Sequence, residues 1–214
     1  MLPGDGIGPE VVAAGRDTLE AVARAFGHEF TFVEAGMGGA AIDATGQPLP
    51  PDTLALCRSA DAVLLGAVGG PRWTGAVRPE QGLLGLRRGL GVFANIRPVV
   101  VWPESSGSSP IKADRLAGVD LVVVRELTGG IYFGEKTLTG AAGAERATDL
   151  CVYTTTEIAR VTRVAAGFAQ ARRGRLTSVD KANVLETSRL WRRVVTEVVK
   201  SEFPHVALDH MLVD

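Results

Sequence analysis

The sequence predicts an α/β fold of largely parallel sheets with flanking helices. Short apolar runs, typical of buried strands, alternate along the chain with stretches whose apolar residues recur at the helical period. The chain has 214 residues, of which 46% are hydrophobic, and is long enough to bury a substantial core. The run lengths and their alternation together favour strands joined by helical crossovers.

Apolar runs of four to eight residues mark the expected strands. These runs are Phe30–Glu34, Ala62–Leu65, Val99–Val101, Leu121–Val124, Leu176–Val179 and Val206–Val213. Because several of them are apolar almost throughout, they are typical of strands covered on both faces.

Amphipathic periodicity predicts three helices, at Pro9 to about Phe26, Thr156–Arg172 and Glu186–Phe203. Gly8 and Pro9 suit the start of the first helix, since proline is tolerated in a first helical turn. Pro204 ends the third helix because proline lacks the amide donor that a further turn requires.

Two domains are expected, residues 1–98 and residues 99–214, each incomplete. Within the second, residues 128–152 are rich in glycine and depart from the strand–helix rhythm. They predict an extended hairpin excursion, with β-like pieces near Ile131–Phe133 and Ala147–Val152.

Both ends of the chain suggest an incomplete fold. Leu2–Gly6 has the character of a strand-to-helix turn without a strand leading into it. At the other end, Asp214 follows directly after an apolar strand.

Composition excludes several classes of protein. The charges nearly cancel, with 23 basic and 24 acidic residues, and aromatic residues make up 6%, which argues against a nucleic-acid partner. No apolar stretch approaches the roughly 20 residues of a membrane span, and no signal peptide is evident. Cys57 and Cys151 fit no metal or redox spacing, so a cytoplasmic location is expected.

Glycine-rich segments do not match the common nucleotide-binding fingerprints. Gly4–Gly8 and Gly66–Gly70 both miss the GxGxxG pattern, and no GxxxxGK[ST] motif occurs. A conventional Rossmann fold or P-loop is therefore not expected, and these glycines alone indicate tight turns.

Charged residues follow several expected strands, at the edge where α/β proteins bind ligands. They are Arg97, Arg125 with Glu126, Asp180 with Lys181, and Asp214. Arginine suits carboxylate recognition, and a carboxylate can help to hold Mg²⁺ or Mn²⁺. Together they predict a small polyanionic acid with a divalent metal, although a single charged residue at a strand end is more often a solvated or paired surface group than a catalytic one.

The chain resembles the 3-isopropylmalate dehydrogenase family of β-decarboxylating dehydrogenases. The resemblance preserves order and spacing along the whole chain, and its most specific parts are LLGLR and RELTGGIYFG. The matching stretches are LPGDGIGPEV (Leu2–Val11), GGAAIDATGQPLP (Gly38–Pro50), LLGAVGGPRW (Leu64–Trp73), RPEQGLLGLRRGLGVFANIRP (Arg78–Pro98), VRELTGGIYFGE (Val124–Glu135) and SVDKANVLE (Ser178–Glu186).

The resemblance implies catalytic roles residue by residue. Arg97 and Arg125 correspond to clamps on the carboxylates of the malate substrate. Lys181 corresponds to the base that takes the C2 hydroxyl proton as hydride leaves for NAD, and Tyr132 to the acid that protonates the enol after CO₂ departs. Asp214 corresponds to a substrate-side aspartate that binds the metal, Mg²⁺ or Mn²⁺.

Specificity and cofactor binding are implied in the same way. Leu83 and Leu84 would form an apolar wall for an isopropyl group, and Gly70, Glu80 and Asn183 would contact the cofactor. The residues alone leave other interpretations open for the leucines and for two of the catalytic residues. Leu83 and Leu84 could belong to the core, Tyr132 could pack across an interface, and Lys181 could pair with Asp180.

The excursion at residues 128–152 resembles the arm through which such enzymes form homodimers, with Lys181 and Asp214 serving the partner's site. One departure is Gly107, where many members place a further carboxylate-binding arginine. The leading hypothesis is NAD-dependent oxidative decarboxylation of 3-isopropylmalate in leucine biosynthesis. The alternatives are a sibling acting on tartrate or homoisocitrate, and a non-catalytic dimerisation partner.

We predict that this chain alone is inactive and poorly folded. The family's other metal-binding aspartates, and the loop that holds the adenosine half of NAD, correspond to segments beyond the residues matched. Turnover of 3-isopropylmalate with NAD and Mn²⁺, measured with purified chain of this length, checks the expectation. Measurable turnover would show it to be wrong.

Overall fold

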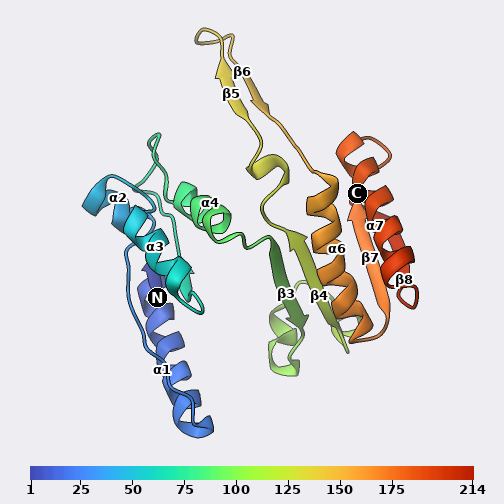
Figure 1. The fold of residues 1–214 in the computed structure, drawn as a ribbon, viewed down its shortest axis with the longest axis horizontal. Helices are drawn as coiled ribbons and strands as arrows, with labels where there is room; N and C mark the ends of the chain where they lie inside the picture. Colours follow the sequence, from blue (N-terminus) through green and yellow to red (C-terminus); the bar gives the residue numbers. More distant parts are fainter. The chain divides into compact units, whose positions relative to one another are not determined.

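The chain folds into two compact units, Met1–Gly91 and Val92–Asp214 (Figure 1). The structure is a computed structural model that describes residues 1–214, apart from the side chains of residues 103, 105 and 106. The units divide at Gly91, whereas the sequence predicts a domain boundary at residue 98. The difference arises because strand β3, Ala94–Val100, pairs along its whole length within the second unit.

The first unit combines one parallel strand pair with helices. Its elements are β1 (Leu2–Gly4), α1 (Gly8–Phe26), α2 (Gly39–Thr45), α3 (Pro51–Ser59), β2 (Leu65–Ala67) and α4 (Pro79–Leu90). Leu2 pairs with Leu65 and Gly4 with Ala67. Leu2 and Met37 lie at the centre of the core, with Cys57 and Leu86 beside them.

Two sequence expectations for this unit are wrong. Leu2–Gly4 is itself a strand, so the first strand-to-helix turn is supported by pairing with β2. Residues 30–34, expected as a strand, are irregular. The Met1 amino group donates to Val33 O at 2.6 Å and Ala35 N donates to Met1 O at 3.0 Å. These two hydrogen bonds both involve Met1, and they do not continue into a ladder of paired strands.

A buried carboxylate ties the first unit together. The side chain of Asp5, in a residue 4% exposed, accepts hydrogen bonds from three backbone amides. Gly39 N and Ala40 N donate at 2.8 Å each, and Gly69 N donates at 2.9 Å. The first two belong to the start of α2, whose free N–H groups favour an anion. Asp5 thereby fixes α2 and the loop after β2 against the end of β1.

The second unit contains two helices packed on each other and three strand pairs. Its helical elements are η1 (Pro103–Ser108), α5 (Ala113–Leu116), η2 (Gly130–Tyr132), α6 (Thr155–Gln170) and α7 (Glu186–Glu202). Its strands are β3, β4 (Asp120–Glu126), β5 (Lys136–Thr139), β6 (Arg146–Asp149), β7 (Arg175–Asp180) and β8 (Ala207–Leu212). Ile158 of α6 and Val194 of α7 lie in the shared core, 0% and 1% exposed.

The α/β class is confirmed, and the strand directions are mixed. Within the described residues, β1–β2 and β7–β8 are parallel, and β3–β4 and β5–β6 are antiparallel. The excursion at residues 128–152 does contain a hairpin, which projects from the second unit as β5 and β6 (Figure 1). Its first strand begins at Lys136, because the predicted piece at Ile131–Phe133 instead falls on the 3₁₀ turn η2.

Strand β3 also differs from the prediction. The sequence places a strand at Val99–Val101 and sets Arg97 beyond the end of an earlier strand. In the structure β3 runs through Arg97 and Pro98, with Arg97 opposite Val123 and Pro98 opposite Val122. An edge strand accommodates proline because one side of it needs no amide donor. No described helix is long and apolar enough to cross a membrane.

We predict that Asp5→Asn lowers the free energy of unfolding by about 2–3 kcal/mol. The substitution replaces a charged acceptor of three backbone hydrogen bonds by a neutral amide, whose NH₂ group faces backbone N–H donors. Urea denaturation of the native gene product, followed by circular dichroism, measures the change. Asp61→Asn, at an exposed position, is the control and should stay within about 0.5 kcal/mol of the parent. Equal stability of the two variants would contradict the role assigned to Asp5.

Candidate active site

The residues expected to form the site are shared between the two units. Four lie in the first unit: Gly70, Glu80, Leu83 and Leu84. Six lie in the second unit: Arg97, Arg125, Tyr132, Lys181, Asn183 and Asp214.

Two arginines share one face of the β3–β4 pair. Arg125 lies opposite Asn95, and Arg97 lies two residues beyond Asn95 on the same strand. Because side chains alternate along a strand, Arg97 and Arg125 are diagonal neighbours on that face. Both are exposed, and Arg97 Nε donates to Asn95 Oδ1 at 2.6 Å. The face presents two guanidiniums, which suit carboxylates.

Tyr132 joins this pair of arginines. The Arg125 guanidinium carbon lies 5.0 Å from the centre of the Tyr132 ring, a cation–π distance. Tyr132 ends η2 and is 55% exposed, so its hydroxyl is available to a ligand. The structure therefore brings a predicted carboxylate clamp and the predicted acid together.

The turn between β4 and η2 is organised by Glu126, which sequence reasoning noted only as a charged residue at a strand end. Its carboxylate accepts from Thr128 N at 2.8 Å, Thr128 Oγ1 at 2.9 Å and Gly129 N at 2.5 Å. Arg160 of α6 donates to the same carboxylate at 2.7 Å. The Glu126 side chain is 1% exposed, so these donors replace the water it has lost.

Lys181 and Asp214 meet at the carboxyl edge of the parallel β7–β8 pair. Lys181 follows β7 directly, and Val213 N donates to Asp180 O at 2.9 Å, which extends the pairing to the end of the chain. The Lys181 ammonium forms an ion pair with the Asp214 carboxylate. Hydrogen bonding to Lys181 lowers the pKa of Asp214 below its ordinary value.

Asp180 has partners other than Lys181. Its carboxylate receives Arg192 Nε at 2.9 Å and Arg192 Nη2 at 2.8 Å, and Ala182 N donates at 2.9 Å. Burial alone would raise the pKa of Asp180, but the hydrogen bonds from Arg192 and Ala182 hold it below its usual value. The carboxylate fixes the turn on which Lys181 and Ala182 lie.

His210 faces Asp180 from β8. Its Nδ1 lies 4.0 Å from Asp180 Oδ2, is buried and has no hydrogen-bond partner among the described residues. Thr196 Oγ1 donates its one proton to Arg192 O, so it accepts from His210 Nε2 at 3.1 Å. Burial and the Arg192 charge lower the pKa of His210, although Asp180 and Asp209 act in the opposite direction.

The remaining cofactor-side residue of the second unit, Asn183, lies in the short turn after β7. Leu185 N and Val184 N both donate to Lys181 O, at 2.9 and 3.0 Å. Asn183 is exposed on this turn, two residues from Lys181. The structure thus places it beside a predicted catalytic residue.

In the first unit, Glu80 approaches the glycine loop after β2. A Cβ on Gly69, whose φ is +109°, would lie 2.8 Å from Glu80 Oε1, and exposed Gly70 is the next residue. Leu83 packs against the core around Leu2 and Met37, while Leu84 is half-buried. The leucines therefore share α4 with Glu80, and one of them contributes to the core.

The described residues do not by themselves complete a divalent-metal site. No three of their histidine, cysteine, aspartate and glutamate side chains gather closely enough to hold an ion. Asp214, the predicted ligand, contributes one carboxylate, and this group is paired with Lys181.

Known proteins resemble the whole chain. The family model for isocitrate/isopropylmalate dehydrogenase matches residues 1–214. A 3-isopropylmalate dehydrogenase from Halalkalibacterium halodurans is 55% identical over all of this chain and 60% of its own length. One from Anaeromyxobacter dehalogenans is 57% identical over all of this chain and 62% of its length. The chain thus spans about 60% of these curated relatives.

Solved structures show the same likeness. Isocitrate dehydrogenase from Methylococcus capsulatus matches with a TM-score of 0.84 and 31% identity, over 100% of this chain and 59% of that one. A β-decarboxylating dehydrogenase from Thermococcus kodakarensis matches with a TM-score of 0.72 and 32% identity, over 100% of this chain and 57% of that one.

We predict that the free energy of unfolding falls as the pH drops below about 6.5, the ordinary pKa of histidine. The pKa of His210 is lowered in the folded state, so the unfolded chain binds its proton first and is favoured in acid. Asp180, whose folded pKa is also lowered, adds a further loss below about pH 4.

His210→Gln should flatten the pH dependence of stability between about pH 6.5 and 5. Urea midpoints of the native gene product and its variants, measured across this pH range, provide the test. His205→Gln, at an exposed position, is the matched control and should keep the parent slope. Identical slopes for the parent and His210→Gln would count against the assignment.

Proposed function

The chain belongs to the isocitrate/isopropylmalate dehydrogenase family, and from this we propose that it carries out part or all of an oxidative decarboxylation of 3-isopropylmalate with NAD. The substrate is suggested by the relatives named 3-isopropylmalate dehydrogenase, which are 55% and 57% identical to this chain. The reaction would belong to leucine biosynthesis in the cytoplasm.

One observation carries the proposal: Arg97, Arg125 and Tyr132 share one surface of the second unit. Two exposed guanidiniums on one sheet face match the two carboxylates of a malate. The adjacent phenol supplies a proton donor at the same place. A hydroxy acid that loses CO₂ requires both features.

The proposed chemistry assigns one task to each residue. Arg97 and Arg125 bind the carboxylates and orient the substrate. The Lys181 side chain accepts the C2 hydroxyl proton while hydride leaves C2 for NAD, which yields a ketone. Loss of the β-carboxylate as CO₂ leaves its electron pair in an enolate, and Tyr132 donates the proton that restores the ketone.

Binding of NAD is proposed for Gly70, Glu80 and Asn183. The reaction class calls for Mg²⁺ or Mn²⁺, and Asp214 is proposed as one carboxylate ligand. The described residues do not complete that site, and no step above is assigned to the metal.

Leu83 and Leu84 are proposed to select the isopropyl group. A half-buried apolar surface on α4 favours a branched hydrocarbon, whereas a further carboxylate would lose its hydration there. Tartrate and homoisocitrate remain the competing substrates, and comparing their kcat/KM with that of 3-isopropylmalate distinguishes the three.

A homodimer is proposed, with the β5–β6 hairpin as the arm that pairs with a second subunit. Leu138 on this hairpin is 73% exposed, as expected of an apolar side chain that a partner covers. In such a dimer Lys181 and Asp214 would serve the partner's site.

We predict that Lys181→Met in the native gene product lowers kcat by about 10²–10⁴-fold, because the base is lost. NADH formation from 3-isopropylmalate is the readout. Lys200→Met, at an exposed position near the end of α7, should retain the parent kcat. An unchanged kcat for Lys181→Met would remove the central assignment.

A further inference from the structure

Glu126 and Arg160 form a buried pair directly behind the predicted site. The Glu126 side chain is 1% exposed and that of Arg160 is 34% exposed. Arg160 Nη2 donates to Glu126 Oε1 at 2.7 Å and to Thr128 Oγ1 at 2.5 Å. The Arg160 guanidinium also lies 4.6 Å from the centre of the Phe93 ring.

This pair is poorly explained as a source of stability. The free energy lost when two charges leave water offsets much of the free energy gained from their attraction. Proteins with apolar residues in place of such a pair are often equally stable. Arg160 Nε is buried and has no hydrogen-bond partner among the described residues, which adds to that cost. A role in fixing geometry accounts for the arrangement better.

The geometry that the pair fixes is the turn leading to Tyr132. Glu126 holds the amides of Thr128 and Gly129, and the chain bends at these two residues directly after β4. Gly130 follows with φ +74°, and a Cβ there would lie 2.3 Å from the Tyr153 hydroxyl oxygen. The chain then enters η2, whose last residue is Tyr132.

The neighbour of Glu126 on β4 is Arg125, whose side chain is exposed. Because successive side chains of a strand point to opposite faces, the Glu126 carboxylate lies away from the Arg125 guanidinium. Glu126 acts on Arg125 through the turn: it holds the amides of Thr128 and Gly129, and the turn brings the Tyr132 ring to the Arg125 guanidinium.

We propose that Glu126 and Arg160 are positioning residues, which hold the turn after β4 and thereby place Tyr132 against Arg125. Their value to catalysis rests on the proposed function of Arg125 and Tyr132. The positioning itself is a property of the folded chain and can be measured without turnover.

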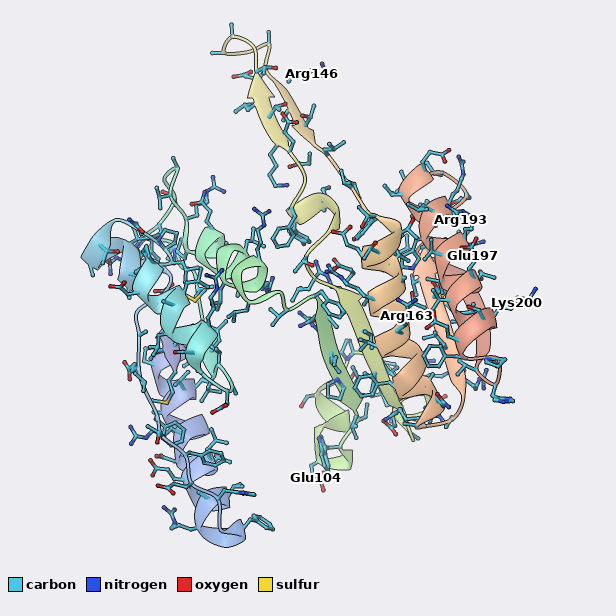
Figure 2. All side chains as sticks on the ribbon, in the orientation of Figure 1. Glu104, Arg146, Arg163, Arg193, Glu197 and Lys200 are labelled. Carbon is cyan, nitrogen blue, oxygen red and sulfur yellow. The ribbon has the colours of Figure 1, made fainter. Side chains whose placement is uncertain are left out.

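A second pair on the same helix serves as the control. Arg163, labelled on α6 in Figure 2, donates to Glu202 from Nε at 2.7 Å and from Nη2 at 2.6 Å. Both of its side chains are more exposed, at 51% and 38%, and Glu202 lies on α7. This pair matches Arg160–Glu126 in chemistry and does not touch the turn after β4.

The experiment is ¹⁹F NMR of the native gene product labelled with 3-fluorotyrosine. Tyr132 and Tyr153 are the two tyrosines of this sequence, and Tyr132→Phe assigns the Tyr132 resonance. Arg125→Gln removes the cation from the Tyr132 ring and so defines the shift that reports their stacking. Glu126→Gln should move the Tyr132 resonance most of the way to that position, while Glu202→Gln should leave it in place.

Arg160→Lys and its control Arg163→Lys decide the matter if Glu126→Gln does not fold. Lysine keeps the charge but lacks the planar fork that bonds Glu126 and Thr128 together, so an intermediate shift is expected only for Arg160→Lys. A Tyr132 resonance that stays at the parent position in the folded variant overturns the proposal. Turnover is not measured, so failure of the Lys181 assignment remains a separate result.

Discussion

The requirement that buried backbone amides find acceptors determines how the loops of this protein are held. Three of the described acidic residues are buried at the carboxyl ends of strands: Asp5 just after β1, Glu126 as the last residue of β4 and Asp180 as the last residue of β7. Each accepts hydrogen bonds from amides of a following or neighbouring loop. A buried amide without an acceptor raises the free energy of the folded state by about as much as a lost hydrogen bond. Each carboxylate therefore favours the one loop conformation in which its amides are paired.

In the second unit this arrangement places the cationic residues of the predicted site. Arg125 precedes Glu126, and Lys181 follows Asp180. In both cases an arginine from a covering helix neutralises the buried acid, Arg160 from α6 and Arg192 from α7. The adjacent basic side chain points away from the buried acid, because neighbouring side chains at the end of a strand face opposite sides. Arg125 lies against Tyr132, and Lys181 pairs with Asp214.

Sequence periodicity predicted the elements whose signals are local. Helices α6 and α7 begin and end within two residues of their predicted bounds, because amphipathic faces and end signals act over neighbouring turns. Thr154 and Glu157 form a capping box at the start of α6.

What depends on distant partners could not be predicted. Residues 30–34 have the sequence of a strand, but the backbone hydrogen bonds that join this segment to Met1 form no ladder in the described structure. Strand β3 continues through Pro98 because β4 pairs with it. Arg160, one of two arginines on the amphipathic helix α6, gives no local sign that it reaches Glu126. In the first unit, Asp5 bonds Gly69 across 64 positions, and β1 needs β2 for its pairing. During synthesis, therefore, the amino-terminal helix emerges long before its sheet can form, and the nascent first unit must stay unassembled until Gly69 has left the ribosome.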